Sequence, residues 1–368
     1  MRHRRLASIV SMMLMGLTAL ASAQDSTTVE RPKARGIARY PLLNSLYEFV
    51  KEFSRVDTDY VEPQHYNYTL MLQNTNTYEV YHLRSKTGSE VVFSPKPAYK
   101  LGPYIGWRWI FLGYTIDLTH LGNGDGRRDL NLSLYSNQIG VDLFYRKSGN
   151  GYRIKSVTLA PNKRLDKMED VPFDGFRSSI KGFNLYYIFN HRKFSYPAAY
   201  SQSTVQRRSA GSPIVGIGYT KHHLSIDWQQ FEDILVERTG QTYASGDIDT
   251  TMVFSDVNYT DYSVSGGYAY NWVFARNWLF DISLQAALAY KRTTNDMNSG
   301  NSGFLRTFDF KNINIDGILR TGVVWNNTKW YAGVNSIVHA YSYRKSQFST
   351  NNIFGSVNFY VGFNFGKK

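Results

Sequence analysis

The C-terminal third of the chain alternates between apolar and polar residues with a period of two. Between Trp278 and Lys291, one set of alternate positions is apolar: Trp278, Phe280, Ile282, Leu284, Ala286, Leu288 and Tyr290. The positions between them are mostly small or polar: Leu279, Asp281, Ser283, Gln285, Ala287, Ala289 and Lys291. A period of two indicates β-strands, whose successive side chains point to opposite faces. Aromatic residues close the apolar face at both ends, which is typical of a strand that crosses a membrane.

Three later stretches repeat this pattern, at residues 313–325, 330–343 and 353–365. All exceed the length that is usual for a strand of a globular protein. Further upstream, the alternation predicts strands near Tyr99–Trp107, Ile110–Leu118, Leu130–Ser136, Ile139–Arg146, Arg153–Leu159, Phe183–Asn190, Ile214–Trp228 and Tyr262–Trp272. The total is about twelve strands, or fourteen if Tyr66–Gln73 and Tyr78–Leu83 add a hairpin, and bacterial barrels have an even number.

The composition favours membrane strands over membrane helices. Mean hydropathy is −0.38, and no segment after residue 23 approaches a run of about 18 apolar residues. Yet 15% of the residues are aromatic. A barrel wall exposes only every second side chain to lipid, so half-apolar strands with aromatic ends suffice. We therefore predict an all-β fold, a transmembrane antiparallel outer-membrane β-barrel with a short N-terminal periplasmic helix.

Residues 1–23 have the pattern of a cleaved signal peptide. Arginines near the start precede an apolar run from Leu6 to Leu20, and Ala21-Ser22-Ala23 supplies the small residues of a cleavage site. A retained membrane anchor is the alternative, but the run is short for a helical span. The chain has no cysteine, which excludes lipoprotein processing, disulfides and thiolate metal sites.

The remaining chain divides into a periplasmic extension, residues 24–65, and a barrel, residues 66–368. In the extension, Pro41 is placed to start a helix, and one helical face is apolar: Leu42, Leu46, Phe49, Val50 and Phe53. This helix either plugs the periplasmic mouth or packs on the barrel rim.

Loop lengths predict how the barrel is oriented. Short turns at Phe274–Asn277 and Asn326–Asn327, with longer polar connections at the other end, place both termini in the periplasm. The stretch Lys193–Ser212 does not fit this scheme. Strand parity makes it a periplasmic turn, although it is about twenty residues long, against the usual handful.

The last strand carries a candidate insertion signal. Phe359, Phe363 and Phe365 share one face of an alternating stretch that ends almost at the C-terminus. This resembles the terminal signal read by the outer-membrane insertion machinery, although Gly366-Lys367-Lys368 replaces a strictly terminal Phe. The barrel-insertion machinery is therefore an expected partner.

The formal net charge of +13 suggests an anionic partner. In an envelope, outer-membrane lipid and lipopolysaccharide phosphate are more available than nucleic acid, which we do not expect to bind. An envelope protein is a further possible partner. Most basic residues are scattered in pairs along predicted loops.

Several charged residues fall on the predicted inner face of the barrel: Arg108, Asp117, Asp142, Arg146, Asp227, Asp281, Asp316 and Arg320. A buried charge must be paired or hydrated. These residues therefore either fill a narrow lumen with ion pairs or line a water-filled path. Asp316 and Arg320 lie about 13 Å apart along one strand, so each needs a partner elsewhere.

Three segments resemble a family of Bacteroidota outer-membrane barrels known only as a domain of unknown function. They are Asp57–Val61, Phe194–Gln202 and Gln206–Ser212. The resemblance extends from about Asp57 to Phe365 and implies the fold and the location, but no catalytic residues. It also implies that Lys193–Ser212 is a designed feature of the barrel.

The sequence favours a non-enzymatic barrel, either a narrow transport route or a scaffold in an envelope complex. The alternative is an outer-leaflet lipid-modifying hydrolase of the phospholipase or lipid A deacylase type, for which His222, His223, His339, Asp227 and Ser336 are the nearest candidates. No nucleophile, metal or phosphate-binding motif accompanies them. We therefore predict no catalytic residues, no metal and no cofactor.

Overall fold

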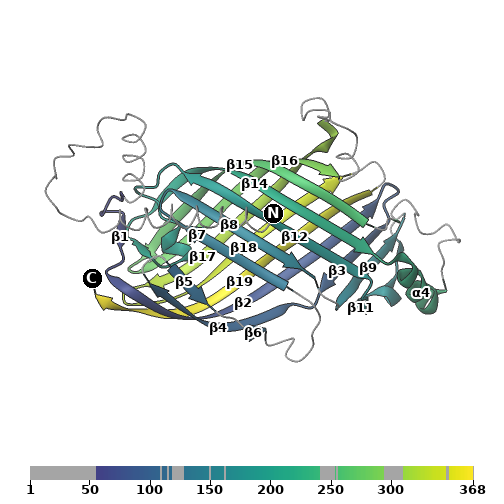
Figure 1. The fold of residues 1–368 in the computed structure, drawn as a ribbon, viewed down its shortest axis with the longest axis horizontal. Coiled ribbons are helices and arrows are strands. Elements are labelled where there is room, and N and C mark those ends of the chain that lie inside the picture. The colour runs from purple at the N-terminus through teal and green to yellow at the C-terminus, as the bar shows by residue number, and fades with distance from the viewer. Residues whose placement is uncertain are drawn as a thin grey trace, which may run out of the picture.

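The computed structural model describes residues 55–107, 110–113, 116–117, 128–148, 151–160, 163–240, 253, 256–293, 310–344 and 348–367. Within them, long antiparallel strands form one curved, barrel-shaped sheet, and two short strands form a second sheet. Figure 1 shows α4 and β11 at one end of this body, and β1 and the C-terminus at the other. The described part contains no helix with the length and apolarity needed to cross a bilayer.

The wall consists of β2 (Tyr66–Ser85), β4 (Ala98–Trp107), β5 (Ile110–Gly113), β6 (Ile116–Asp117), β7 (Arg128–Tyr135), β8 (Ile139–Lys147), β12 (Phe176–Ile188), β14 (Ala210–Ile226), β15 (Asp256–Ala275), β16 (Trp278–Thr293), β17 (Ile313–Asn326), β18 (Trp330–Arg344) and β19 (Phe348–Lys367). Neighbours pair in the order β7-β8-β12-β14-β15-β16-β17-β18-β19-β2-β4, and β4 pairs in turn with β5 and β6. All these pairs are antiparallel, which confirms the prediction of an antiparallel β-sheet.

The first long strand, β2, lies beside the last, β19. Their register runs from Tyr66 opposite Lys367 to Ser85 opposite Phe348, so the sheet bends round to bring the two ends of the described chain together. Residues 118–127, which connect β6 to β7, lie outside the described residues.

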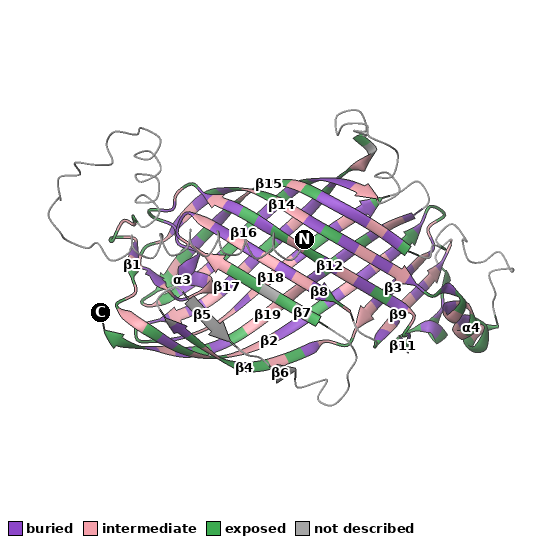
Figure 2. Cartoon of the chain, viewed as in Figure 1, coloured by how far each residue is buried: buried purple, intermediate pink, exposed green. Residues whose placement is uncertain are grey.

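The two faces of the wall differ as the alternation predicts. On β16, Leu284 and Leu288 are 64% and 62% exposed, whereas Asp281 and Gln285 are almost completely buried. Figure 2 shows this alternation of buried and exposed residues along neighbouring strands. Tyr290 departs from the prediction, because it is buried on the face expected to be outward.

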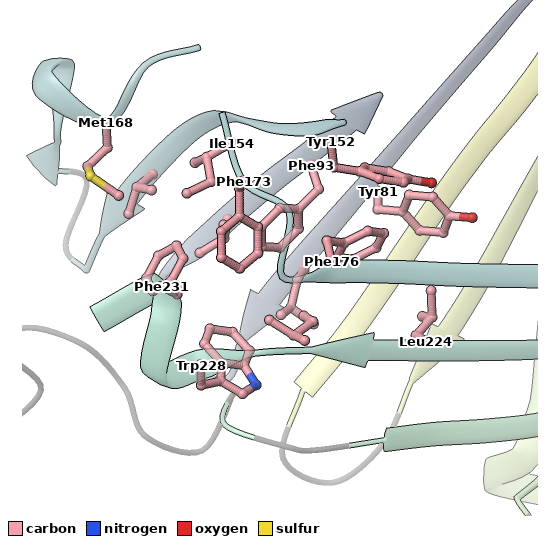
Figure 3. Packing of buried hydrophobic residues seen from close by; sticks show 14 of the residues in the cluster. Tyr81, Phe93, Tyr152, Ile154, Met168, Phe173, Phe176, Leu224, Trp228 and Phe231 are labelled. Carbon is pink, nitrogen blue, oxygen red and sulfur yellow. The ribbon is translucent and has the colours of Figure 1, made fainter. Parts of the chain in front are cut away.

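A small packed unit, which we call the head, lies at the end of the barrel opposite the C-terminus (Figure 1). It contains β3 (Glu90–Pro95), β9 (Tyr152–Leu159), β10 (Lys163–Arg164), η2 (Asp166–Met168), β11 (Val171–Pro172) and α4 (Trp228–Thr239). β3 joins the end of β2 to β9, and β9 pairs with β10 and β11. Its apolar side chains pack on those of the barrel end in one buried cluster (Figure 3).

The helix α4 begins and ends where its sequence dictates. The carboxylate of Asp227 accepts a hydrogen bond from the backbone N–H of Gln230 and caps the N-terminus. Gly240 ends the helix with φ of 71°. Trp228, Phe231 and Leu235 recur on one side of the helix and are buried in the head. Asp227 therefore caps a helix and is exposed to solvent, so its predicted place in the lumen is wrong.

Three predictions about strands also need correction. Arg153–Leu159 is β9, which belongs to the head and not to the wall. The hairpin considered at Tyr66–Leu83 is one continuous strand, β2. The strand at residues 214–228 ends at Ile226, because α4 begins at Trp228. The predicted signal peptide and the helix at Pro41 lie outside the described residues, as does Arg108.

Candidate functional site

The stretch between β12 and β14 folds back into the end of the barrel, and we call residues 190–209 the plug. It contains α3 (Pro197–Tyr200) and β13 (Thr204–Gln206). Phe194, Tyr196, Ala198 and Ala199 in this segment are all buried. The plug is therefore the packed content of the barrel end and not a long surface turn, which resolves the anomaly at Lys193–Ser212.

The side chain of Gln206 holds the plug together. Its amide oxygen accepts from the backbone N–H of Ser195 at 3.0 Å and from Asn271 Nδ2 at 2.9 Å. Its amide nitrogen donates to the carbonyls of Lys193 and Arg208 at 2.6 and 2.9 Å. All four hydrogen-bonding positions of this buried amide are used, so Gln206 fixes both ends of the plug and ties them to β15.

The segment that precedes the barrel locks the plug in place. β1 (Val61–Pro63) pairs with β13 in a two-stranded sheet. The ammonium of Lys193 lies 4.9 Å from the ring centre of Tyr60, and Arg207 forms an ion pair with Glu62. The segments Asp57–Val61, Phe194–Gln202 and Gln206–Ser212, which carry the family resemblance, therefore meet at this end of the barrel.

The plug is also hydrogen-bonded to the inner wall. The hydroxyl of Tyr200 donates to Asp281 on β16, and Tyr196 bonds to Ser283 on the same strand. Burial, followed by the charge of Asp281, raises the pKa of Tyr200 well above its ordinary value, so the phenol stays a donor. Gln202 reaches Tyr360 on β19 at 3.0 Å and accepts from Asn326 on β17 at 2.9 Å.

An ion pair crosses the middle of the barrel. Arg320 on β17 has no exposed surface and donates to Asp142 on β8. Four strands separate β8 from β17 along the sheet order, so this contact spans the lumen. The Arg320 guanidinium also lies 4.9 Å from the ring centre of Tyr186, and Ser133 donates to Asp142 at 2.7 Å.

Two further charged groups fill the lumen on the head side of this pair. Lys291 contacts Asp316 at 2.9 Å and Asp261 at 3.5 Å, and it donates to the carbonyl of Ser342 at 2.7 Å. Glu79 accepts from Tyr81, from Tyr152 at 3.1 Å and from Ser178 at 3.2 Å. Glu79 Oε2 also lies 3.8 Å from Arg146 Nη1. Acidic and basic groups in such close contact favour the prediction that ion pairs fill the lumen over the prediction that the charges line a water-filled path.

Five of the eight predicted lumen charges are therefore buried inside the barrel: Asp142, Arg146, Asp281, Asp316 and Arg320. Asp227 is not, and Arg108 lies outside the described residues. Asp117 pairs with Lys100 through its backbone in β6, and nothing is described of its side chain. Asp316 and Arg320 find separate partners on other strands, as their spacing predicts.

Three of the interacting charges are not among the predicted lumen residues. Lys291 lies on the predicted polar face of its strand but was not counted as a lumen charge. Asp261 lies just before the predicted strand Tyr262–Trp272, and Glu79 lies in the possible hairpin at Tyr66–Leu83. The signal was nevertheless present, because Glu79 and Tyr81 alternate with the exposed Tyr78. The role of Gln206 could not be found, since its four bonding partners come from the irregular backbone of the plug or from a distant strand.

The candidate hydrolase residues do not form a catalytic cluster. His339 is buried between aromatic rings, 4.9 Å from that of Phe354, and His222 stacks on Tyr259 at 4.4 Å. Ser336 lies on the alternate, outward set of positions of β18. Within the described ranges, no group of three or more His, Asp or Glu side chains could hold a metal ion.

A family model, Domain of unknown function (DUF4421), matches residues 55–365. No curated protein sequence matches the chain. Solved structures that resemble it include the outer membrane protease OmpT from Escherichia coli, with 7% identity and a TM-score of 0.32 over 81% of this chain and 97% of that one. Another is the outer membrane protein OprG from Pseudomonas aeruginosa, with 9% identity and a TM-score of 0.26 over 83% and 98%. A third is the toluene transporter TodX of P. putida, with 8% identity and a TM-score of 0.21 over 82% and 91%.

Proposed function

We propose, from the premise that this chain belongs to the DUF4421 family, that it is an outer-membrane barrel closed to solutes. Its role is then structural, as a scaffold in an envelope complex, and not that of a transport route. This proposal has three parts: the barrel spans the membrane, its head lies outside the cell, and its lumen is sealed.

The outward face of the wall supports insertion in a bilayer. Its exposed side chains are large and apolar on successive strands, for example Ile217, Val264, Leu288 and Ile315, which lie in one cross-strand row. A soluble protein rarely exposes an apolar band of this extent. Counting β5 and β6 as one interrupted strand gives twelve wall strands, and the proposal places the closure of the wall between β6 and β7.

The connections support an orientation with the head outside. β15 and β16 are joined by a tight turn at which Asn277 has φ of 67°, and β17 and β18 by one at which Thr328 has φ of 77°. Both turns lie at the plug end. The head end instead carries the strand ends between which the sequence is much longer: Ile226 and Asp256, and Thr293 and Ile313. Bacterial barrels keep their short turns in the periplasm, so the plug and both termini are periplasmic.

The observation that carries the sealed lumen is the direct contact between Arg320 and Asp142. These two side chains meet from opposite sides of the barrel. When aromatic rings also pack around them, no continuous path for solutes is left through the lumen. Tyr135, Tyr186 and Tyr196 form that packing. The plug blocks the periplasmic end, and the buried cluster of the head covers the other end.

Planar-bilayer recording of the refolded chain tests this function. We expect no ion current above that of the bare bilayer, although the protein inserts and migrates as a heat-modifiable barrel. Liposomes that contain the protein should likewise not swell in small sugars. Stepwise currents or sugar uptake with the unmodified chain would show that the lumen is a transport route.

A further inference from the structure

The outward face carries a compact group of cations near the head end, which we call the basic patch. Its members come from four neighbouring strands and are all exposed: Arg128 on β7, Lys147 on β8, Arg177 and Lys181 on β12, and Lys221 on β14. None of the five side chains makes an ion pair or a hydrogen bond with a described residue.

The strand register sets these cations against one another. Lys181 lies directly opposite Lys221 on the next strand, and Arg128 lies directly opposite Lys147. Opposed residues of antiparallel strands are about 5 Å apart at their Cα atoms, and like charges in this arrangement destabilise the sheet. Lys147 is opposite Ser179, which lies between Arg177 and Lys181 along β12. The five cations are therefore contiguous.

No described carboxylate neutralises the basic patch. Asp256 at the start of β15 lies 3.8 Å from His223 and is opposite Ser225, so it pairs with none of the five. Elsewhere in the barrel, cations are matched with acids, as Lys291 and Arg320 are. The patch is thus an unneutralised, preorganised set of donors for an anion.

The position of the patch along the strands indicates which anion it binds. One step along the strands toward the plug, the outward side chains change to a row of aromatic rings, Phe183, Tyr219 and Tyr262, with ring centres 6.1 and 5.4 Å apart. Beyond them the outward residues are aliphatic, such as Leu185 and Ile217. Aromatic rows of this kind lie at the level of lipid headgroups. The cations therefore sit just outside the apolar band, at the level of the phosphates.

We propose that the basic patch binds the phosphate groups of a phosphorylated glycolipid of the outer leaflet, whose acyl chains lie on the aliphatic surface below it. This proposal rests on the proposed function, because it needs the head end to face outward in an outer membrane. Lys181 and Lys221 lie nearest the aromatic row and contact the phosphate directly, and the other three cations extend the positive field outward.

The test measures thermal unfolding of the full chain in detergent, with and without purified bisphosphorylated lipid A. We expect the lipid to raise Tm. Lipid A from which both phosphates have been removed, and inorganic phosphate at the same concentration, should leave Tm unchanged. In the variant Lys181→Gln/Lys221→Gln, lipid A affinity should fall about thirtyfold, since each lysine near an anionic lipid surface contributes about fivefold.

Without lipid, the double variant should be at least as stable as the parent, because the opposed charges have been removed. Arg344→Gln is the matched control, since Arg344 is exposed at the head end of β18, outside the patch. It should keep the full response to lipid A. The response of the parent should weaken as salt is raised, because the contact is electrostatic.

Any of three outcomes would overturn the proposal. In the first, lipid A raises the Tm of the double variant as much as that of the parent. In the other two, dephosphorylated lipid A or inorganic phosphate raises the Tm of the parent as much as phosphorylated lipid A does. None of these outcomes contradicts the proposed function, provided that the same samples insert in bilayers and carry no current. Failure of the parent to insert would instead refute the proposed function itself.

Discussion

Arg320 and Asp142 lie 178 residues apart in the sequence and join opposite sides of the barrel interior. Removing one partner of a buried ion pair leaves an uncompensated charge, which costs about 3–5 kcal/mol. We expect Arg320→Met and Asp142→Leu each to lower the free energy of unfolding by that order. The double variant should recover part of the loss, because an apolar pair leaves no charge buried. Urea unfolding in lipid vesicles measures this, and additive losses would contradict the pairing.

The plug should control whether the barrel conducts. Tyr196 and Tyr200 fill its tip and bond to Ser283 and Asp281. Replacing both tyrosines with alanine removes two large side chains from the lumen, so we expect a small ion current in planar bilayers. Tyr268→Ala/Tyr270→Ala is the control, since both tyrosines are exposed on the outer wall. If the double plug variant carries no ion current, the Arg320–Asp142 pair alone is sufficient to block the lumen.

Depth in the membrane should decide how the outer face tolerates charge. Leu284 is 64% exposed near the centre of β16, and Trp278 is exposed on the same face at its plug end. An arginine at the midplane costs about 2–4 kcal/mol, but at the interface about 0–1 kcal/mol. Leu284→Arg should therefore slow or prevent folding into vesicles, whereas Trp278→Arg should not. Equal effects would mean that the apolar band lies elsewhere.

The last strand should carry the insertion signal. Phe359 and Phe365 are exposed on the outer face of β19, and Phe363 is half-buried. Changing all three to serine should leave the protein degraded in the periplasm. The matched control changes three exposed aromatic residues of β15, Tyr262, Tyr268 and Tyr270, to serine. If both triple variants reach the outer membrane equally, the phenylalanines are only part of the apolar band.

The head should keep one electrostatic contact in mild acid. Hydrogen bonds from Arg153 and Lys155 lower the pKa of Asp170 from 3.8 to about 2. A depressed folded-state pKa gives stability that is present above pH 4 and is lost as pH falls through about 2. Asp170→Asn suits the φ of 53° at this residue. The difference in Tm between parent and variant should hold from pH 7 to 4 and vanish near pH 2, and its loss by pH 4 would contradict this.

The sequence predicted the features that depend on local alternation. The two faces of β16 and the burial of Asp281, Asp316 and Arg320 follow from a period of two, because a strand has only two faces. The head was not predicted, since Arg153–Leu159 alternates like a wall strand and only its pairing with β3 shows otherwise. Asp227 was misplaced because strand alternation extends one residue into a helix cap.

The partners of the lumen charges could not be predicted for a different reason. Alternation shows that Arg320 points inward, but its partner depends on the curvature of the whole sheet. The same holds for Tyr200 and Asp281, which meet only because the plug turns into the lumen. The length of Lys193–Ser212 was the one sign of this in the sequence.

The way in which β1 and the plug are interlocked also links the steps of assembly. β1 precedes the first wall strand, the plug lies between β12 and β14, and the plug bonds to Tyr360 on the last strand. Because the plug bonds to Tyr360, its contacts are complete only when β19 has also paired with β2. We therefore expect docking of the plug and pairing of the first and last wall strands to form one cooperative step, so that an open barrel without its plug does not accumulate.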